Sequence, residues 1–199
     1  MKFLFASDSF KGTLSSEQII TLLDAAAKNV FPDCETMGIP VADGGEGTID
    51  AVISVLHGSI YEVDVHGPLM EEVVSRYGET GNGAAVIEMA AASGLPMVPV
   101  DKRDPRVTTT YGTGELIKTA LDRGCRDITI AIGGSATNDG GMGAMRALGI
   151  RFLDENGEEL SGCGNDLARV ADIDISGLHS AVKDARFTIS SDVNNPLTG

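Results

Sequence analysis

The fold is decided by Ile128-Thr-Ile-Ala-Ile-Gly-Gly-Ser-Ala-Thr-Asn-Asp-Gly-Gly-Met-Gly143. Its opening residues are apolar and mostly β-branched, which predicts a buried strand over 128–132. A polar, glycine-rich turn follows, and Met142–Leu148 has the composition of a helix. A turn between a strand and a helix often holds a small anion, because free N–H groups and the positive helix end point there. The stretch predicts either such a ligand site or a tight turn that needs glycine for positive φ.

The same Asp-Gly-Gly-x-Gly pattern occurs earlier in the chain, as Asp43-Gly-Gly-Glu-Gly47 after the largely apolar segment 39–42. In open α/β sheets, ligands bind beyond the carboxyl ends of the strands. Two copies of the pattern, each after an apolar segment, therefore predict two loops that face one cleft. Two separate tight turns remain the alternative, because Asp and Gly both suit turn geometry.

Composition narrows the possible partners. The 199 residues suffice for one large domain or two small ones, and 42% hydrophobic with 22% charged residues is typical of a soluble globular protein. The formal net charge of −14 argues against nucleic acid and against an anionic membrane as partners. An anionic substrate would have to be met by locally placed Lys and Arg. The oligomeric state is not predicted.

The cysteines and the N-terminus predict a cytoplasmic protein. Cys34, Cys125 and Cys163 are widely spaced and form no CxxC pair, which favours reduced thiols over disulfides or a zinc site. Met1–Ala6 is too short for the apolar region of a signal peptide, and no apolar run approaches the length of a membrane span.

The N-terminal quarter predicts a parallel sheet with helical cover. A strand is expected over Lys2–Ala6, and Ser15-Ser-Glu-Gln18 is a possible capping box before a helix with apolar residues at helical spacing. An extended segment over Thr36–Ala42 and a helix over Thr48–Leu56 follow. The order strand, helix, strand, helix is typical of an α/β protein.

The pattern changes after Gly58. Three strand-like runs with short turns between them predict an antiparallel meander, which we assign to a second domain. Further along, a helix is expected over Glu115–Arg123 with Thr113 as its N-cap, and a last strand over Arg186–Ser190. No covering helix follows that strand, so we expect the sequence to be incomplete relative to its fold, or the sheet to be covered by something else. The three runs of the meander are 60–65, 72–77 and 84–89.

The chemistry is expected to come from loops after strands, because no P-loop, GxGxxG, HExxH or GxSxG motif is present. Phosphoryl transfer needs carboxylates for Mg²⁺, a carboxylate that takes the alcohol proton, a cation and backbone N–H groups for phosphate. Each residue taken alone also has a structural interpretation as a cap, a turn former or a solvated charge. Glu88 is harder to explain in this way, because it interrupts an apolar run where a buried charge is costly. The candidates are Asp8, Lys11, Asp43, Glu46, Glu88, Asn138, Asp139, Asp192 and Asn194.

Six motifs, distributed in order over the whole chain, resemble the bacterial glycerate kinase family, type I. The long exact matches make the resemblance specific. They are Ser7-Asp-Ser-Phe-Lys-Gly12, Pro40-Val-Ala-Asp-Gly-Gly-Glu-Gly-Thr48, Ile87-Glu-Met-Ala-Ala-Ala-Ser-Gly-Leu95, Thr108-Thr-Thr-Tyr-Gly-Thr-Gly-Glu115, Ile132-Gly-Gly-Ser-Ala-Thr-Asn-Asp-Gly-Gly141 and Ser191-Asp-Val-Asn-Asn-Pro-Leu197.

The resemblance implies transfer of the ATP γ-phosphate to a hydroxyl of D-glycerate, with Mg²⁺ as cofactor and 2-phosphoglycerate as the favoured product over 3-phosphoglycerate. It implies a flavodoxin-like α/β domain and a second α/β domain resembling the restriction-endonuclease fold, with a cleft between them. We place these at 1–64 and 65–199. Family members are longer and continue past the Asn-Pro-Leu motif, so the C-terminal remainder of the family fold is expected to be missing here.

The resemblance also suggests roles for individual residues. Asp8 or Asp192 is expected to accept the hydroxyl proton and Lys11 to steady the transferred phosphate. Asp43, Glu46 and Asp139 are expected to bind Mg²⁺ or to order its water shell, and Arg103 or Arg106 to hold the glycerate carboxylate. The expected substrate and phosphate contacts are Gly44, Gly45, Glu88, Arg103, Arg106, Thr110, Thr113, Gly133, Gly134, Ser135, Thr137, Asn138 and Asn194.

Two alternatives remain open. The chain could be a truncated fragment without catalysis, or a module that binds a small acid or phosphate without turnover. ATP-dependent consumption of D-glycerate would separate both from a kinase.

Overall fold

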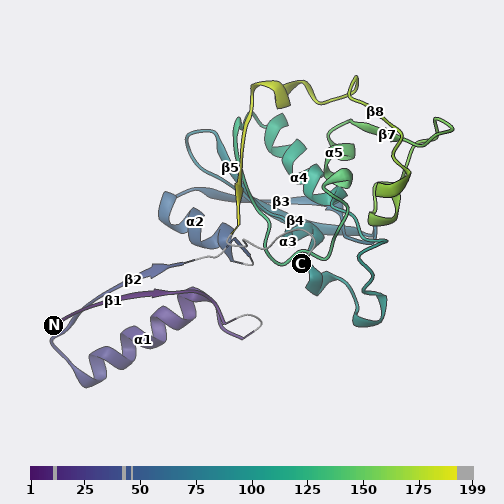
Figure 1. Ribbon diagram of the computed structural model, residues 1–199. Helices are drawn as coiled ribbons and strands as arrows, with labels where there is room; N and C mark the ends of the chain where they lie inside the picture. The colour runs from purple at the N-terminus through teal and green to yellow at the C-terminus, as the bar shows by residue number, and fades with distance from the viewer. Residues whose placement is uncertain (11–12, 42–43, 46, 192–199) are drawn as a thin grey trace.

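A computed structural model describes residues 1–10, 13–41, 44–45 and 47–191. Its N-terminal unit is β1 (Lys2–Ser7), α1 (Ser16–Val30) and β2 (Glu35–Pro40), and the two strands pair in parallel from Lys2–Glu35 to Ser7–Pro40. The predicted capping box is confirmed: the Ser15 hydroxyl accepts from the Gln18 N–H, and the Gln18 side chain accepts from the Ser15 N–H. The unit extends away from the rest of the molecule (Figure 1).

The main body is built on a five-stranded sheet in the order β3-β4-β5-β6-β9. The first three strands pair antiparallel, which confirms the predicted meander, and β5, β6 and β9 run parallel. The mixed α/β class is therefore confirmed. The bounds are β3 (Ser59–His66), β4 (Glu72–Glu79), β5 (Ala84–Glu88), β6 (Asp127–Ala131) and β9 (Arg186–Ser190).

Helices cover both faces of this sheet (Figure 1). On one face, α2 (Thr48–Leu56) packs Ile49 and Ile53 against Val86 of β5. On the other face, α4 (Tyr111–Asp122) packs against Ile87 in the largest apolar cluster of the described chain. Neighbouring residues of β5 point to opposite faces, as the alternation of a strand requires.

A small subdomain follows β6. It contains α5 (Met142–Ala147), β7 (Arg151–Leu153) and β8 (Asp172–Asp174), and the two strands pair antiparallel. Met142, Phe152 and Leu160 form its buried cluster. Short helical turns complete the chain: α3 (Ala90–Ser93) and the 3₁₀ turns η1 (Leu95–Met97), η2 (Val100–Lys102), η3 (Gly164–Arg169) and η4 (Ser180–Asp184).

One predicted helix boundary is wrong. The helix expected over 115–123 begins at Tyr111, with Thr110 at the N-cap position, and Thr113 lies inside it. The Thr113 hydroxyl contacts the Ser93 hydroxyl at 2.8 Å instead of capping the helix. The predicted domain boundary at 64/65 falls within β3, and the division of the chain into domains stays a prediction.

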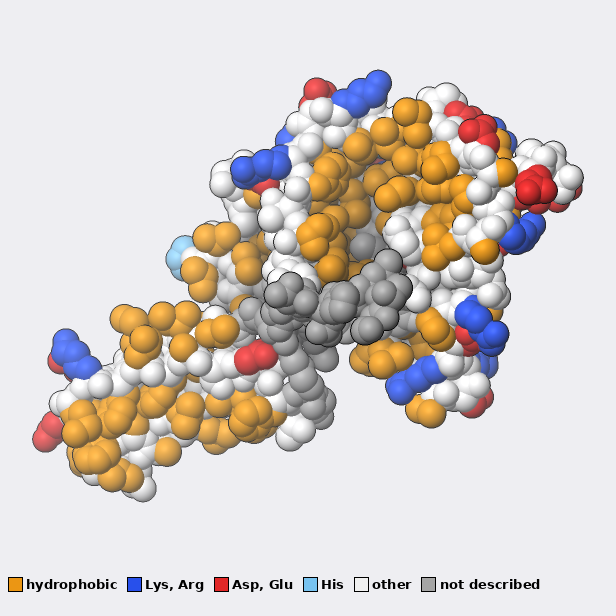
Figure 2. Space-filling model, viewed as in Figure 1, with side chains coloured by type: hydrophobic (Ala, Val, Ile, Leu, Met, Phe, Trp, Pro, Cys, Tyr) orange, Lys and Arg blue, Asp and Glu red, His pale blue; other side chains and the backbone are white. Residues whose placement is uncertain are grey.

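The N-terminal unit leaves one face of its strands open. Leu4 and Met37, which are paired in register, are 62% and 63% exposed. Phe3 lies on the opposite face and packs against Phe31 after α1. Figure 2 shows the resulting apolar side chains over this unit at the lower left. Within the described part of the chain, no helix is long and apolar enough to cross a membrane.

Candidate functional site

The glycine-rich segment that follows β6 touches the first Asp-Gly-Gly loop, in their described residues, at the carboxyl ends of β6 and β9. The Gly133 N–H donates to the Gly44 carbonyl at 2.9 Å. A Cβ on Gly133 would lie 2.8 Å from the Gly45 Cα, so only glycine permits this approach. Gly44 has a φ of +87°, and a Cβ there would lie 3.0 Å from the Ser190 carbonyl. The two segments therefore meet through a direct backbone contact, and the prediction that the two Asp-Gly-Gly loops face one cleft stays a prediction.

The segment after β6 is held against the end of β5 by backbone hydrogen bonds. The Leu95 N–H donates to the Gly134 carbonyl, and the Ala136 N–H donates to the Ser93 carbonyl, each at 2.9 Å. Within the segment, the Ser135 hydroxyl contacts the Thr137 hydroxyl at 2.8 Å and accepts from the Thr137 N–H at 3.0 Å. Ser135 and Thr137 are thus held in one conformation by each other.

Asp139 is buried, with 1% of its surface exposed, and its carboxylate accepts hydrogen bonds from two segments. Oδ2 accepts from the Thr110 N–H and hydroxyl, both at 2.8 Å, and from the Gly143 N–H at 3.1 Å. Oδ1 accepts from the Gly141 N–H at 2.9 Å. These four donors match the roughly four lone-pair sites of a carboxylate. Asp139 therefore joins the start of α4 to the start of α5.

Glu88 is also buried, with 3% exposed, at the end of β5. Its Oε1 accepts from the Ile49 N–H at 2.9 Å, in the first turn of α2. Burial raises the pKa of this carboxyl, and the hydrogen bond from Ile49 offsets part of the rise. The polar residue that interrupts the apolar run is explained by this bond to a helix N-terminus.

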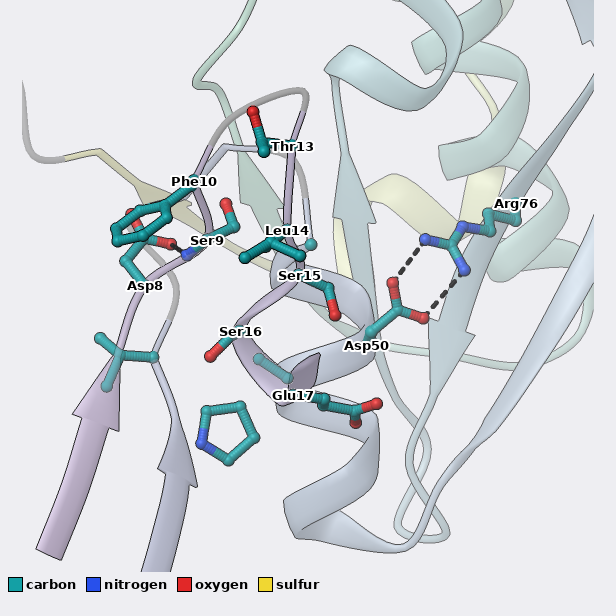
Figure 3. A pocket seen from close by; sticks show the side chains of 14 residues that line it. Asp8, Ser9, Phe10, Thr13, Leu14, Ser15, Ser16, Glu17, Asp50 and Arg76 are labelled. Atoms are coloured by element: carbon teal, nitrogen blue, oxygen red, sulfur yellow. Dashed lines mark hydrogen bonds and ion pairs between the residues drawn. The ribbon is translucent and has the colours of Figure 1, made fainter. Parts of the chain in front are cut away.

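A hollow of about 410 Å³ lies between the N-terminal unit and the body. Asp8 borders it on one side, and its Oδ1 accepts from the Ser9 N–H at 2.7 Å. On the other side, the Arg76 guanidinium makes two bonds to the Asp50 carboxylate, at 2.9 and 2.6 Å (Figure 3). Ser15, Ser16 and Glu17, at the start of α1, line the hollow between them.

A second hollow, of about 370 Å³, lies between α4, α5 and the segment after β6. Its floor is apolar, with Ile117, Ile130 and Ile132. Its polar lining consists of residues predicted to contact substrate, phosphate or metal: Thr110, Thr113, Ser135, Thr137, Asn138 and Asp139.

The structure brings some predicted residues together and leaves others apart. Asp8 and Asp139 line different hollows. Arg103 and Arg106 line neither: the Arg103 Nε–H donates to the Val98 carbonyl at 3.3 Å, and Arg106 pairs with Asp104 at 2.7 Å on the surface. That guanidinium lowers the pKa of Asp104 to about 2. The predictions for Lys11, Asp43, Glu46, Asp192 and Asn194 fall outside the described residues.

Arg76 and Asp50 were not predicted as site residues. Arg76 lies in a strand whose neighbours Ser75 and Tyr77 are buried, so the alternation places it on the opposite face, towards α2. That signal indicates its face but not its partner, because Asp50 is 26 residues away and is brought to it only by the packing of α2 on β4.

Among the described residues there is no group of three or more His, Cys, Asp or Glu side chains that could hold a metal ion. Of the three predicted ligands only Asp139 is described, and its four hydrogen-bond donors occupy the positions that a metal would need. The metal role of Asp139 stays a prediction that this geometry does not support.

The fold and the joined loops define an α/β protein whose candidate ligand site lies at the carboxyl ends of parallel strands. The model of the glycerate kinase family matches residues 3–199. The chain therefore belongs to the glycerate kinase family.

Individual relatives agree with the family match. Over 200 residues the chain is 50% identical to the glycerate kinase of Bacillus subtilis strain 168 and 48% identical to the glycerate 2-kinase of Escherichia coli K12, covering 100% of this chain and 52% of each relative. A crystal structure of a protein assigned as glycerate kinase 2, from Salmonella typhimurium LT2, matches with a TM-score of 0.85 and 46% identity. It covers 100% of this chain and 54% of that structure. The chain spans about half the length of these relatives.

Proposed function

We propose that this chain contributes to an ATP-dependent kinase that phosphorylates D-glycerate, with 2-phosphoglycerate as the favoured product. The family match and the names of the relatives support a glycerate kinase. The observation that carries the proposal is the contact from the Gly133 N–H to the Gly44 carbonyl. It joins two glycine-rich loops at the strand ends, where α/β proteins bind phosphorylated ligands.

The hydroxy acid is proposed to bind in the hollow that Asp8 borders. A carboxylate at its rim is suited to accept the hydroxyl proton as the oxygen attacks the γ-phosphorus. Asp192 remains the other candidate for this role. The Arg76–Asp50 ion pair forms the opposite wall. Lys11 is proposed to contact the transferred phosphate.

Phosphate contacts are proposed for the segment after β6. Ser135 and Thr137 offer hydroxyl groups that are ordered by each other, and Gly133 and Gly134 allow a ligand to approach the backbone closely. ATP as phosphoryl donor follows from the kinase names of the relatives. Mg²⁺ would offset phosphate charge when bound, but the described residues give it no ligand set.

The domain division is proposed to follow the packing. The unit of β1, α1 and β2 forms one part, and α2 packs with β4 and β5 in the other. We propose that the open face with Leu4 and Met37 is covered by the half of the protein that the longer relatives have in addition.

We also propose a cytoplasmic location, which the free Cys34, Cys125 and Cys163 support.

The test is a coupled assay of ATP consumption with D-glycerate and with glycerol, which lacks the carboxylate. The assay compares the 199-residue chain alone, the chain fused to the second half of the E. coli relative, and the intact E. coli enzyme as positive control. We expect turnover of D-glycerate by the fusion and little by the chain alone. A folded fusion that consumes no D-glycerate would refute the kinase. A thermal shift with glycerate but no product would support the binding module instead, and a broad melt of the chain alone would support the fragment.

A further inference from the structure

Two buried carboxylates occupy equivalent places beside the two glycine-rich loops. We propose that Glu88 and Asp139 are positioning residues, each of which binds the N-terminus of the helix after one loop and thereby holds the two loops in contact. This role differs from the phosphate contact and the metal ligation predicted for them. The relevance of this role to phosphoryl transfer rests on the proposed function. The hydrogen bonds that define the role do not depend on that function.

Both helices begin at a glycine that has no capping side chain. The N-cap of α2 is Gly47, with a φ of +94°, and the N-cap of α5 is Gly141, with a φ of +79°. A helix start leaves its first N–H groups without intrahelical partners, and a glycine cannot supply the usual side-chain oxygen. The acceptor must then come from another residue.

A buried carboxylate supplies that acceptor in both cases. For α5 it is Asp139, two residues before the N-cap, which binds the Gly141 and Gly143 N–H groups. For α2 it is Glu88, which lies 39 residues further along the chain than Ile49 and reaches its N–H from the end of β5. The local solution and the long-range solution place a carboxyl oxygen on the N–H of the same helix position, Gly143 in α5 and Ile49 in α2.

The two carboxylates also connect to the loop contact. Asp139 fixes the start of α5 to Thr110, whose hydroxyl accepts from the Ala144 N–H at 2.9 Å. Glu88 pairs in register with Ala131, immediately before the segment that carries Gly133. Each carboxylate therefore lies one short segment away from the bond between Gly133 and Gly44 without touching it.

This arrangement has an electrostatic consequence. A carboxylate at each helix N-terminus interacts with the same positive end of the dipole that would attract a phosphate. A phosphate at either position would have to displace a buried carboxyl group that already accepts the N–H groups of the helix start. Ligand phosphates are therefore expected beside Ser135 and Thr137 rather than at the ends of α2 and α5.

The experiment measures amide hydrogen exchange by NMR in the 199-residue chain, which requires no turnover. Asp139→Asn replaces one acceptor oxygen by an amide group, Glu88→Met removes the oxygen that binds the Ile49 N–H at a similar side-chain length, and Asp104→Asn is the control at a partly exposed carboxylate. We expect the Gly133 amide to exchange at least about tenfold faster in each of the first two variants and unchanged in the control. An unchanged Gly133 amide in both would overturn the proposal.

A second pair of variants keeps the test valid if Asp139→Asn does not fold. Thr110→Val removes one hydroxyl donor to Asp139, whereas Thr110→Ser retains it. Faster Gly133 exchange in the valine variant alone supports the positioning role. Equal exchange in the two variants contradicts it.

An experiment with added metal ion distinguishes the positioning role of Asp139 from a role as metal ligand. Mn²⁺ added to the same samples broadens the NMR signals of nearby residues if Asp139 is a ligand. We expect the same broadening in the wild type and in Asp139→Asn. Broadening around Asp139 that disappears in the variant would show that Asp139 is a metal ligand and would overturn the positioning role. Neither result depends on glycerate kinase activity, so failure of this inference is distinguishable from failure of the proposed function.

Discussion

The N-terminal unit and the five-stranded body are both α/β, yet they bury very different amounts of apolar surface. Among the described residues of 1–41, Ile19 is the only apolar side chain that is buried. The body contains a large continuous cluster that includes Tyr77, Leu116 and Ile128, all fully buried. Regular secondary structure therefore does not guarantee a core. The body is expected to unfold cooperatively, and the unit depends on whatever covers its open face.

The largest expected effect comes from the body. Leu116→Ala should destabilise the chain by about 3 kcal/mol, because it leaves a cavity in the main cluster. The matched change in the unit, Leu4→Ala, should cost less than about 0.5 kcal/mol, because Leu4 is already exposed. Urea unfolding followed by circular dichroism measures both. Equal costs would show that the two regions share one core.

The two substitutions Leu116→Ala and Leu4→Ala can also be compared in the chain fused to the second half of the E. coli relative. If that half covers the open face, Leu4→Ala should there cost about 2 kcal/mol or more, as for other buried leucines. An unchanged small cost in the folded fusion would mean that the face stays open.

The next effect concerns the hollow between the two regions. Asp8→Asn should lower kcat of the fusion by at least about tenfold if Asp8 accepts the proton in the transition state. Glu35→Gln is the control, because Glu35 lies at the other end of the unit in an exposed pair with Lys2. Steady-state kinetics with D-glycerate measure both. Full activity of Asp8→Asn would transfer the role to Asp192 or to another group.

A smaller effect is expected at the start of α1. Ser15→Ala removes one bond of the capping box and should cost about 1 kcal/mol of helix stability. Because the unit has little core, the loss should appear as faster amide exchange confined to α1, with the body unaffected. Hydrogen exchange resolved by peptide or residue measures this. A matching increase throughout the body would contradict the independence of the two regions.

The pH dependence of stability gives the smallest effect. Burial raises the folded-state pKa of Glu88, so its contribution to stability is fully present below the unfolded pKa and is lost as pH rises through the folded pKa. Glu88→Gln does not titrate. The stability of the wild type relative to this variant should therefore fall as pH rises from about 4 towards 7. Urea unfolding at several pH values checks this, and a relative stability that rises over that range would show the opposite sign.

Much of the fold was predictable because its signals are local. The capping box at Ser15–Gln18, the meander over β3, β4 and β5 and the strand before Gly133 each follow from spacing within a few residues. The start of α4 was misplaced for the converse reason. Asp139, 29 residues after Thr110, supplies the acceptor there, and no local pattern announces it.

The candidate site likewise has features that the local sequence predicted and features that only distant contacts determine. The repeated glycine pattern predicted two loops that face one cleft, and the structure shows that Gly44 of the first loop meets Gly133, where the close approach of the backbones requires glycine. It did not predict which side chains face a ligand. Arg103 and Arg106 looked suitable from charge alone but lie outside both hollows, whereas Arg76 lines one of them because α2 packs across β4.

By itself the sequence determined the α/β class, the order of its elements and the resemblance to the glycerate kinase family, since periodicity, caps and exact motifs are properties of neighbouring residues. Only the tertiary structure decided what the charged residues do. A carboxylate has the same formula whether it caps a helix, pairs with an arginine or faces a hollow. Its role is set by the donors that folding brings to it, as Glu88, Asp50 and Asp139 show.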